Sequence, residues 1–582
     1  MKVVIGQGSC GISVGADKTK LEFERLIDEK GLDVQVGIAG CIGSCYLEPI
    51  VDIYDDEGGL TRYVKVQPEN VLDIVESHLE NGEICEKYLI EKEDEEFIAK
   101  QTRIVLRNAG IIDPENIEEY IEKEGYKAAK KAVKSMSQDD IIEEIKIAGL
   151  RGRGGAGFPT WEKWTRAKAE RGEKKYIICN ADEGDPGVFM DRSVLEGDPH
   201  SVIEGMIIGA YAIGASEGIV FCRGEYVMAV KRLQMAIDQA REKGFLGKNI
   251  FGTGFSFDIT INIGVGAFVC GEETALIATL EGERGMPRTK PIYPVSKGYW
   301  KQPTNVNNVE TYANVGWILR NGGAAYREYG KDNSRGTKVF ALSGKIKKGG
   351  LVELPLGMTL REVVFGIGGG VQNDKPLKAI QMGGPSGGCV PADKIDTPIT
   401  HENIENLGAM IGSGDMIVVD EDRCMVDMAR FFIDFARKES CGKCNYCRIG
   451  TKRLLEILER IIDGNGREND IELLEELSIK VKDGSMCGLG KTAPNPLLTT
   501  LKYFRNEYED HIFNKKCTAK ACKKLISYNI TDNCKGCTLC SRNCPVQAIS
   551  GSPKEIHKID QSVCIKCGKC YENCRFNAIE IV

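Results

Sequence analysis

A duplicated cysteine motif near the C-terminus constrains this chain most strongly. The segments CKGCTLCSRNCP and CIKCGKCYENCR both follow the spacing C-x2-C-x2-C-x3-C. Thiolates at this spacing hold a pair of [4Fe–4S] clusters, and the fourth cysteine of each run binds the other cluster. Zinc is the weaker alternative, because structural zinc sites are isolated sets of four ligands. We therefore predict a ferredoxin-like domain with two ligand sets: Cys534, Cys537, Cys540 and Cys574 in one, and Cys544, Cys564, Cys567 and Cys570 in the other.

The composition favours metal binding in a cytoplasmic protein. The 23 cysteines among 582 residues gather at short fixed spacings, whereas disulfide-rich folds are usually small. A net charge of -8 disfavours nucleic acid as a partner. The most apolar stretch, residues 201–221, carries Glu204 and Glu217, so we expect no membrane span. The first residues lack the apolar core of a secretory signal, and low-potential thiolate clusters suit an anaerobic cell.

The hydrophobic periodicity predicts a multidomain α/β plus α protein, because strand patterns dominate the first part and helical patterns follow. Residues 114–136 are expected to form one helix capped by Asp113. The predicted parts are 1–85, a small α/β domain; 86–139, a helical linker; 140–336, an α/β cofactor domain; 337–420, a β-grasp-like insert; 421–512, a helical bundle; 513–528, a second linker; and 529–582, the ferredoxin-like domain.

A second cysteine group lies in the predicted bundle. The segment ESCGKCNYCRIGT has C-x2-C-x2-C spacing and SMCGLG supplies one more thiol, which makes a further [4Fe–4S] site or a structural zinc site from Cys441, Cys444, Cys447 and Cys487. The pair of segments resembles the NADH-binding flavoprotein subunit of respiratory complex I and its soluble relatives. The resemblance covers residues 140–512 and extends to GLRGRGGAGFPT, NADEGDPGVFMDR, VCGEETAL and PTNVNNVET. It favours the [4Fe–4S] interpretation.

This resemblance implies an FMN site and a dinucleotide site. Hydride would pass directly to FMN, so no catalytic acid or base is expected. The matching flavin positions are Gly152, Arg153, Gly155, Lys163, Asn180, Asp182, Glu183, Gly271, Glu272, Asn307 and Asn308. The matching NAD positions are Phe158, Asp185, Glu273, Lys290 and Tyr293. The chain departs from complex I at Arg166, Asp185 and Phe268; we expect NAD, with NADP as the alternative because arginine near a ribose favours a 2′-phosphate.

The N-terminal part resembles the thioredoxin-like [2Fe–2S] module of the same complexes. The module's pattern is C-x4-C followed by C-x3-C. Its second half is present as Cys41 and Cys45, but of its first half only Cys10 remains, because Ile5 stands five positions earlier. We expect either that Cys85 or a partner supplies the fourth ligand, or that the domain holds no cluster and serves for docking.

The junction before the ferredoxin-like part carries a candidate zinc site. His511, Cys517 and Cys522 are ligand types that suit structural zinc, and Cys424 is the expected fourth ligand. Soluble bifurcating relatives resemble this chain in having a metal clip here; the alternative is a surface histidine beside unrelated thiols. The remaining histidines are taken as ordinary residues: His78, His200, His401 and His557.

The resemblance is nearest to the flavin subunit of cytoplasmic electron-bifurcating hydrogenases and transhydrogenases, because complex I's own subunit lacks both the N-terminal module and the ferredoxin-like tail. It implies a diaphorase subunit that exchanges hydride with NAD(H) and relays single electrons through clusters. The implied partners are ferredoxin, a small thioredoxin-like [2Fe–2S] subunit, and a hydrogenase, transhydrogenase or formate dehydrogenase subunit. The alternatives are a non-bifurcating NADH dehydrogenase subunit and a cluster scaffold without catalysis.

Overall fold

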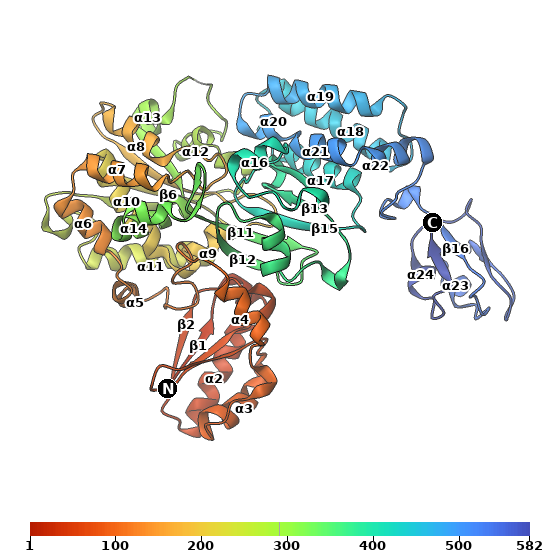
Figure 1. Ribbon diagram of the computed structural model, residues 1–582, viewed down its shortest axis with the longest axis horizontal. Helices are drawn as coiled ribbons and strands as arrows, with labels where there is room; N and C mark the ends of the chain where they lie inside the picture. The colour runs from red at the N-terminus through yellow and green to blue at the C-terminus, as the bar shows by residue number, and fades with distance from the viewer. Residues whose placement is uncertain (290) are drawn as a thin grey trace. The chain divides into compact units, whose positions relative to one another are not determined.

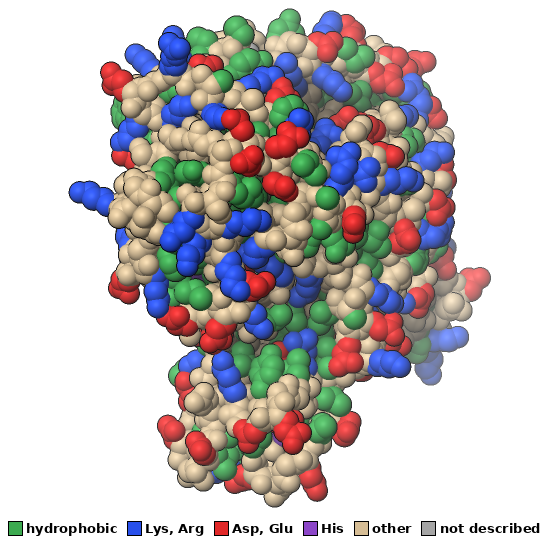
Figure 2. Space-filling view, turned by 60° about the vertical axis from the view of Figure 1, so that its left-hand side comes forward, with side chains coloured by type: hydrophobic (Ala, Val, Ile, Leu, Met, Phe, Trp, Pro, Cys, Tyr) green, Lys and Arg blue, Asp and Glu red, His purple; other side chains and the backbone are tan. Residues whose placement is uncertain are grey.

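The computed structural model describes residues 1–289 and 291–582, and these residues form two compact units (Figure 1). The first unit contains Met1–Lys375, Ala379–Val418 and Met486–Leu489. The second contains Pro376–Lys378, Val419–Ser485 and Gly490–Val582. Among the described residues, no helix combines the length and the apolar character needed to cross a bilayer. Acidic and basic side chains are interspersed over the face seen in Figure 2.

The N-terminal part of the first unit is a small α/β domain. Its sheet has the order β2-β1-β3-β4, in which β1 runs parallel to β2 and antiparallel to β3. Helix α2 (Ala16–Lys30) buries Phe23 against the sheet, in a core that also contains Val3 and Ile5. The strands are β1 (Lys2–Gly6), β2 (Gln35–Ala39), β3 (Val51–Tyr54) and β4 (Leu60–Tyr63).

A parallel sheet of order β7-β6-β5-β8 forms the centre of the cofactor domain. Helix α10 (Pro199–Ile213) is buried on almost every side, which explains why its sequence is apolar around the whole helix. Ligands of such sheets bind beyond the carboxyl ends of the strands. The strands are β5 (Tyr176–Ala181), β6 (Glu217–Arg223), β7 (Asp258–Gly264) and β8 (Thr304–Asn308).

The segment expected to be a helical linker contributes to the core of this domain. Residues from Ile104 to Ala148 share one apolar cluster with the sheet, because alanines on α6 (Lys127–Ser135) let it pack closely. The single helix expected over 114–136 is instead α5 (Ile117–Glu122) and α6, since Glu124 and Tyr126 have positive φ. The side chain that caps α5 is Asn116 and not Asp113.

The insert is a mixed sheet of order β12-β11-β15-β13-β14. Glu353 on β12 is buried and accepts hydrogen bonds from the main-chain nitrogens of residues 104–106, at 2.8–2.9 Å. A short helical segment begins at Leu360 and widens over Glu362–Ile367. The strands are β11 (Thr337–Gly344), β12 (Gly350–Pro355), β13 (Leu377–Met382), β14 (Gly388–Pro391) and β15 (Asp415–Asp420).

The second unit contains a helical bundle and the ferredoxin-like tail. Residues 495–509 form two helices that are separated at Phe504. In the tail, β16 pairs with β19 and β17 with β18, so each strand pair joins the first repeat to the second. The bundle helices are α17 (Met425–Lys438), α18 (Thr451–Ile462), α19 (Asp470–Gly484), α21 (Asn495–Tyr503) and α22 (Arg505–Glu509). The tail elements are β16 (Tyr528–Ile530), α23 (Leu539–Arg542), β17 (Ile549–Ser550), β18 (Lys558–Ile559), α24 (Lys569–Glu572) and β19 (Ile579–Ile581).

Candidate functional site

The glycine-rich loop before α8 (Thr160–Ala169) lies against the carboxyl end of β8. A Cβ added at Gly154 would come within 2.9 Å of the Cβ of Asn308, so the loop needs bare backbone to lie there. Gly155 has φ of 121°, which side chains rarely adopt, and bridges Gly412. The loop therefore offers backbone surface that a flat ring or a phosphate can approach closely.

Side chains from three segments meet beside this loop. Lys163 on α8 donates to the main-chain oxygen of Val306 at 2.6 Å and forms an ion pair with Glu273 at 3.1 Å. Asn180, at the end of β5, donates its side-chain amide to the oxygen of Gly271 at 2.9 Å. Ammonium, amide and carboxylate groups around bare backbone are the donor set that a flavin phosphate and ring require, so the residues present fit FMN.

Several of the expected flavin residues use their side chains within the protein. Glu272 caps α12 (Glu273–Leu280) by accepting from the nitrogens of Thr274 and Ala275. Asn308 likewise caps α14 (Val309–Asn321), and Asn307 accepts from Trp164 at 2.9 Å. Glu183 is buried and accepts from the nitrogens of Asp191 and Arg192. These side chains hold the shape of the site.

The guanidinium of Arg153, one of the expected flavin residues, is engaged within the protein. The residue is 3% exposed, and its guanidinium donates to the main-chain oxygens of Arg151, Arg335 and Thr337. It also donates to the hydroxyl of Tyr326 at 3.0 Å. The side chain therefore fastens the glycine loop to the insert.

Two of the expected dinucleotide residues carry aromatic rings, Phe158 and Tyr293, and each is 41% exposed. The Arg166 guanidinium lies 5.7 Å from the centre of the Phe158 ring and forms an ion pair with Glu162. Lys290 lies outside the described residues.

Asp185 differs from the other expected dinucleotide residues because it is enclosed. It accepts a hydrogen bond from the hydroxyl of Ser413. Burial raises the pKa of Asp185 to about 6, and the nearby charge of Glu183 acts in the same direction. The carboxyl is therefore held where its charge state changes close to neutral pH.

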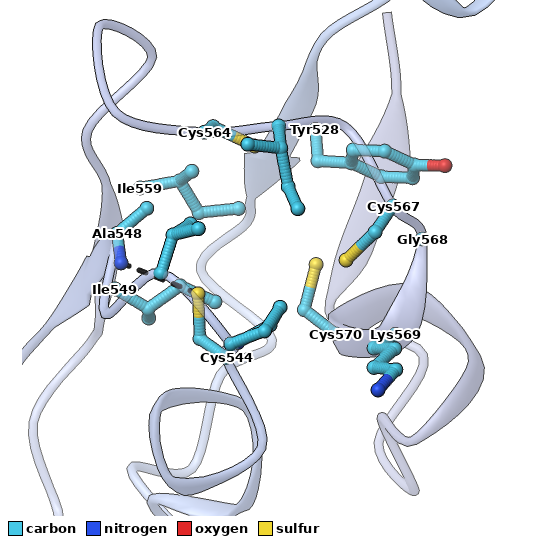
Figure 3. A pocket seen from close by; sticks show the side chains of 13 residues that line it. Tyr528, Cys544, Ala548, Ile549, Ile559, Cys564, Cys567, Gly568, Lys569 and Cys570 are labelled. Carbon is cyan, nitrogen blue, oxygen red and sulfur yellow. Dashed lines mark hydrogen bonds between the residues drawn. The ribbon is translucent and has the colours of Figure 1, made fainter.

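The two cysteine runs of the tail line two separate pockets. The first has an empty volume of about 320 Å³ and contains Cys564, Cys567 and Cys570 together with Cys544 from the other run (Figure 3). The second has a volume of about 340 Å³ and contains the reciprocal set, which is Cys534, Cys537 and Cys540 together with Cys574 from the other run. His557, expected to be an ordinary residue, lines the second pocket and is buried. Each pocket therefore gathers the four thiols that the sequence assigns to one cluster.

In the bundle, the C-x2-C-x2-C segment runs from Cys441 into a wide helical turn at Tyr446–Gly450. The thiol of Cys447 donates to the hydroxyl of Ser440 at 3.2 Å. A Cβ added at Gly490 would lie 2.7 Å from the Cβ of Ser485 and 3.1 Å from that of Cys447. Gly490 is thereby placed close to Cys447.

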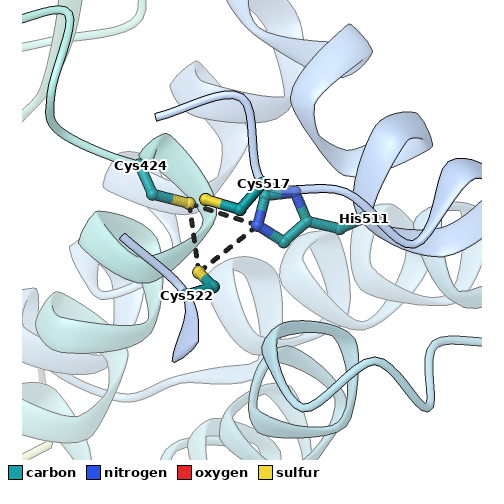
Figure 4. Close-up of side chains that lie close together, drawn as sticks. All are labelled: Cys424, His511, Cys517 and Cys522. Carbon is teal, nitrogen blue, oxygen red and sulfur yellow. Dashed lines mark hydrogen bonds between the residues drawn. The ribbon is translucent and has the colours of Figure 1, made fainter. Parts of the chain in front are cut away.

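Cys424, His511, Cys517 and Cys522 converge in the second unit and are all buried. Their ligand atoms lie within 4.8 Å of one another, and Figure 4 shows the sulfur atoms turned toward the imidazole. Nε2 of His511 is 3.4 Å from the sulfur of both Cys424 and Cys522. Nδ1 lies 2.7 Å from the main-chain oxygen of Glu507, which orients the ring with Nε2 toward the thiols. This set fits a tetrahedral zinc ion.

The thiols of Cys10, Cys41 and Cys45 form another compact group, also within 4.8 Å of one another. The sulfur atoms of Cys10 and Cys45 are 3.7 Å apart, and Arg192 donates to Cys10 at 3.8 Å. Hydrogen bonds from Cys41 and Cys45 lower the pKa of Cys10 to about 3, and Arg192 acts in the same direction. The group favours a thiolate, which is the form that binds metal.

Cys85, one of the candidates for a fourth ligand, does not complete this group. Cys85 packs against the apolar core beside Tyr63, whose hydroxyl accepts from the Cys85 nitrogen at 3.1 Å, and it does not join the three thiols. Glu48, which follows Cys45 by three positions, is only 7% exposed. The sequence analysis missed this residue, although an acid inside the apolar segment YLEPIV was a signal of an unusual role.

Three family models match the chain. Residues 145–317 match the Nuo51 FMN-binding domain, and residues 427–511 match the NADH-ubiquinone oxidoreductase-F iron–sulfur binding region. Residues 557–580 match a 4Fe-4S binding domain. The chain therefore has the domains of an FMN- and iron–sulfur-dependent oxidoreductase that acts on NAD(P)H.

Relatives match over most of their length. NADP-reducing hydrogenase subunit HndC of Solidesulfovibrio fructosivorans is 54% identical over 82% of this chain and 98% of its own. The F subunit of NADH-quinone oxidoreductase from Aquifex aeolicus is 45% identical over 68% of this chain and 91% of its own. A crystal structure of an NAD+-reducing [NiFe]-hydrogenase in the H2-reduced state matches with a TM-score of 0.63 and 29% identity, over 88% of this chain and 84% of that one. The chain belongs to the family of NADH-quinone oxidoreductase F subunits, which are FMN- and iron–sulfur-containing NAD(P)H dehydrogenases.

Proposed function

We propose that this chain is the diaphorase subunit of a cytoplasmic, electron-bifurcating oxidoreductase that exchanges hydride with NAD(H). The observation that carries the proposal is the presence, in one chain, of the FMN domain and of two complete four-thiol pockets in the tail. When bound, FMN accepts two electrons as hydride and releases them one at a time, whereas a cluster carries one. A chain with both kinds of site joins two-electron to one-electron chemistry.

The chain's own residues would orient the dinucleotide. Lys163 and Glu273 neutralise each other beside the glycine loop, so the site presents a fixed dipole and no net charge from this pair. The exposed rings of Phe158 and Tyr293 supply stacking surface for the bases. Asp185, enclosed and bonded to Ser413, would fix the wall of the pocket. Positioning of this kind accelerates transfer without an acid or base.

The cysteines would supply the electron path and its structural support. We assign [4Fe–4S] clusters to the bundle set and to both tail pockets, and a [2Fe–2S] cluster to the N-terminal thiols. The four buried residues around His511 would hold zinc as a structural clip at the start of the tail, since all four protein ligands are present and none is exposed.

NAD is the proposed dinucleotide rather than NADP. Arg166 is the residue that favours a 2′-phosphate, but its guanidinium is already paired with Glu162 on the same helix. A carboxylate next to the guanidinium repels a phosphate. The relative HndC is named as NADP-reducing, which supports the alternative. Glu162→Gln should therefore lower KM for NADPH while KM for NADH stays unchanged; if the wild-type chain already prefers NADPH, the proposal of NAD is wrong.

The partners follow from the relatives. Two of the similar proteins are named as parts of hydrogenases that reduce NADP or NAD+. We propose a hydrogenase, transhydrogenase or formate dehydrogenase subunit as the terminal redox partner, a small thioredoxin-like [2Fe–2S] subunit as a second partner, and ferredoxin as the one-electron carrier.

The decisive experiment measures coupling in the assembled complex. NADH oxidation should require ferredoxin and a second, higher-potential couple together, and omission of either should stop it. Oxidation with one acceptor alone would instead identify a non-bifurcating NADH dehydrogenase subunit, the function that the NADH-quinone oxidoreductase relatives favour.

A second measurement tests the electron path in the isolated chain. Cys441→Ser should leave reduction of the flavin by NADH intact and block reduction of the tail clusters, with Cys389→Ser as a control in a buried thiol outside the cluster sets. If the tail clusters of Cys441→Ser are still reduced by NADH, the proposed path is excluded. A chain without flavin absorbance or NADH-dependent viologen reduction would be a cluster scaffold.

A further inference from the structure

The N-terminal thiol group lacks one ligand for a complete cluster, and the structure provides a candidate. We propose that Glu48 is the fourth ligand of a [2Fe–2S] cluster whose other ligands are Cys10, Cys41 and Cys45. The inference rests on the proposed function to the extent that this domain takes part in electron transfer. It concerns a residue of this chain that the cysteine pattern does not contain.

Glu48 is a buried carboxylate with unused bonding capacity. It is 7% exposed, and its Oε2 accepts from the nitrogen of Ile50 at 3.2 Å. Its Oε1 is buried without a hydrogen-bond partner among the described residues. A buried carboxylate is costly unless a cation, a metal or a proton compensates it. The carboxylate therefore has a reason to bind a positive centre.

The nearest cavity provides no alternative partner for this carboxylate. Glu48 lines a space of about 260 Å³ together with Asp52 and Arg62. Both oxygens of Asp52 accept from the Arg62 guanidinium at 2.7 Å, so that cation is already engaged in a two-point ion pair.

The carboxylate lies close to the residue that follows Cys10. A Cβ added at Gly11, the neighbour of Cys10, would come within 2.9 Å of Glu48 Oε2. A Cβ at Gly6 would lie 3.4 Å from the same oxygen. Ile5, which stands where the family pattern has a cysteine, is instead fully buried in the apolar core with Val3. The space next to the end of β1 is thus filled by the Glu48 side chain.

The Glu48 carboxylate lies beside the thiol group and interacts with the side chain of Cys41. Glu48 nevertheless stands outside the compact group of three sulfur atoms. A binuclear cluster has two ligands on each iron, so ligands on different irons need not be close to one another. The sulfur atoms of Cys10 and Cys45 lie 3.7 Å apart, so these two would share one iron, and Cys41 and Glu48 would bind the other.

Known cluster chemistry allows this ligand set. In Rieske centres one iron of a [2Fe–2S] cluster has non-cysteine ligands, and this replacement of the thiolates changes the reduction potential of the cluster. A carboxylate is a harder ligand than a thiolate and retains the negative charge of the cysteine that it would replace. The Arg192 guanidinium beside Cys10 offsets part of that charge.

The test is electron paramagnetic resonance of the full chain, reconstituted anaerobically with iron and sulfide. Spectra of the dithionite-reduced chain are recorded at temperatures at which [4Fe–4S] signals are broadened and a [2Fe–2S] signal persists. We expect the wild-type chain to show this signal. Glu48→Gln should lose it together with about two iron atoms per chain. Glu48→Cys should restore it with altered g-values, because the oxygen ligand becomes sulfur. Glu57→Gln, an exposed acid of the same domain, is the matched control.

Each other outcome overturns the proposal. An unchanged signal in Glu48→Gln would mean that the residue is not a ligand. If Glu48→Cys also lacks the [2Fe–2S] signal, Glu48 has a structural role only. A signal that appears only when partner subunits are added would assign the fourth ligand to a partner, and no signal in any variant would mean that the domain holds no cluster. Flavin absorbance and NADH-dependent viologen reduction in the same samples report separately on the proposed function.

Discussion

Lys163 Nζ lies 3.1 Å from Glu273 Oε2, which joins α8 to the first residue of α12. The same ammonium group donates to the oxygen of Val306, at the edge where the strands of the parallel sheet end. A residue expected at the flavin and a residue expected at the dinucleotide are thereby held in one ion pair. A substitution at either partner should therefore affect hydride transfer without disturbing the sheet.

Replacing Glu273 with alanine removes the carboxylate partner of this pair. We expect kcat/KM for NADH-dependent viologen reduction to fall by about 100-fold, because the dinucleotide loses its fixed orientation. Flavin absorbance should stay at the wild-type level, since Lys163 retains its bond to Val306. Glu283→Ala, an exposed acid beyond the end of α12, is the control. A wild-type rate in Glu273→Ala would refute the assignment.

Removing one member of the His511 set should release zinc. His511→Ala should lose about one zinc atom per chain, measured by elemental analysis, because three thiols without the imidazole no longer form a closed tetrahedral site. Cys85→Ala is the control, as that thiol belongs to neither compact ligand group. Equal zinc contents in both variants would show that the four residues do not bind the ion.

The crossed pockets of the tail predict which thiols become reactive in each variant. In Cys574→Ser, a cysteine-alkylating reagent should label Cys534, Cys537 and Cys540, whereas the thiols of the other pocket stay protected by their cluster. In Cys544→Ser the pattern should reverse. Mass spectrometry of the labelled chain identifies the sites. Labelling within the mutated run itself would mean that each run binds its own cluster.

Asp185 predicts a pH-dependent stability. Burial raises its pKa from 3.8 to about 6, so the folded state disfavours the ionised form. The resulting destabilisation appears as pH rises above the unfolded value of 3.8 and is complete above about 6. Asp185→Asn should therefore raise Tm above pH 6, by a few degrees, and this gain should vanish near pH 4. Asp33→Asn, an exposed acid in the same unit, is the control. A gain in Tm that does not depend on pH would contradict this explanation.

The sequence was most informative where chemistry depends on spacing. The four-thiol sets of the tail could be assigned from the spacing of the cysteines, and the structure gathers those same thiols into two pockets. The set around His511 was also found by residue type, although Cys424 is 87 positions away from His511 in the chain. Few arrangements satisfy several thiols and an imidazole at once, so such sets are visible in sequence.

The sequence was less informative where a side chain has more than one use. Arg153 matched a flavin-binding motif, yet its guanidinium donates to main-chain oxygens of the insert, which no local pattern predicts. The end of a helix depends on backbone angles such as the positive φ at Glu124, so one expected helix became two. Glu48 escaped notice because its role depends on burial and on a missing partner, and both are properties of the folded chain.

The crossed arrangement of cysteines in the tail makes its two halves interdependent during assembly. Neither repeat contributes four thiols to one pocket, so neither half can complete a cluster before the other has folded against it. Iron would act as a crosslink that closes the loop between the repeats and stabilises both at once. The tail should consequently load its metal in one cooperative step, and a protease cut between the repeats should leave a domain that stays joined until the iron is removed.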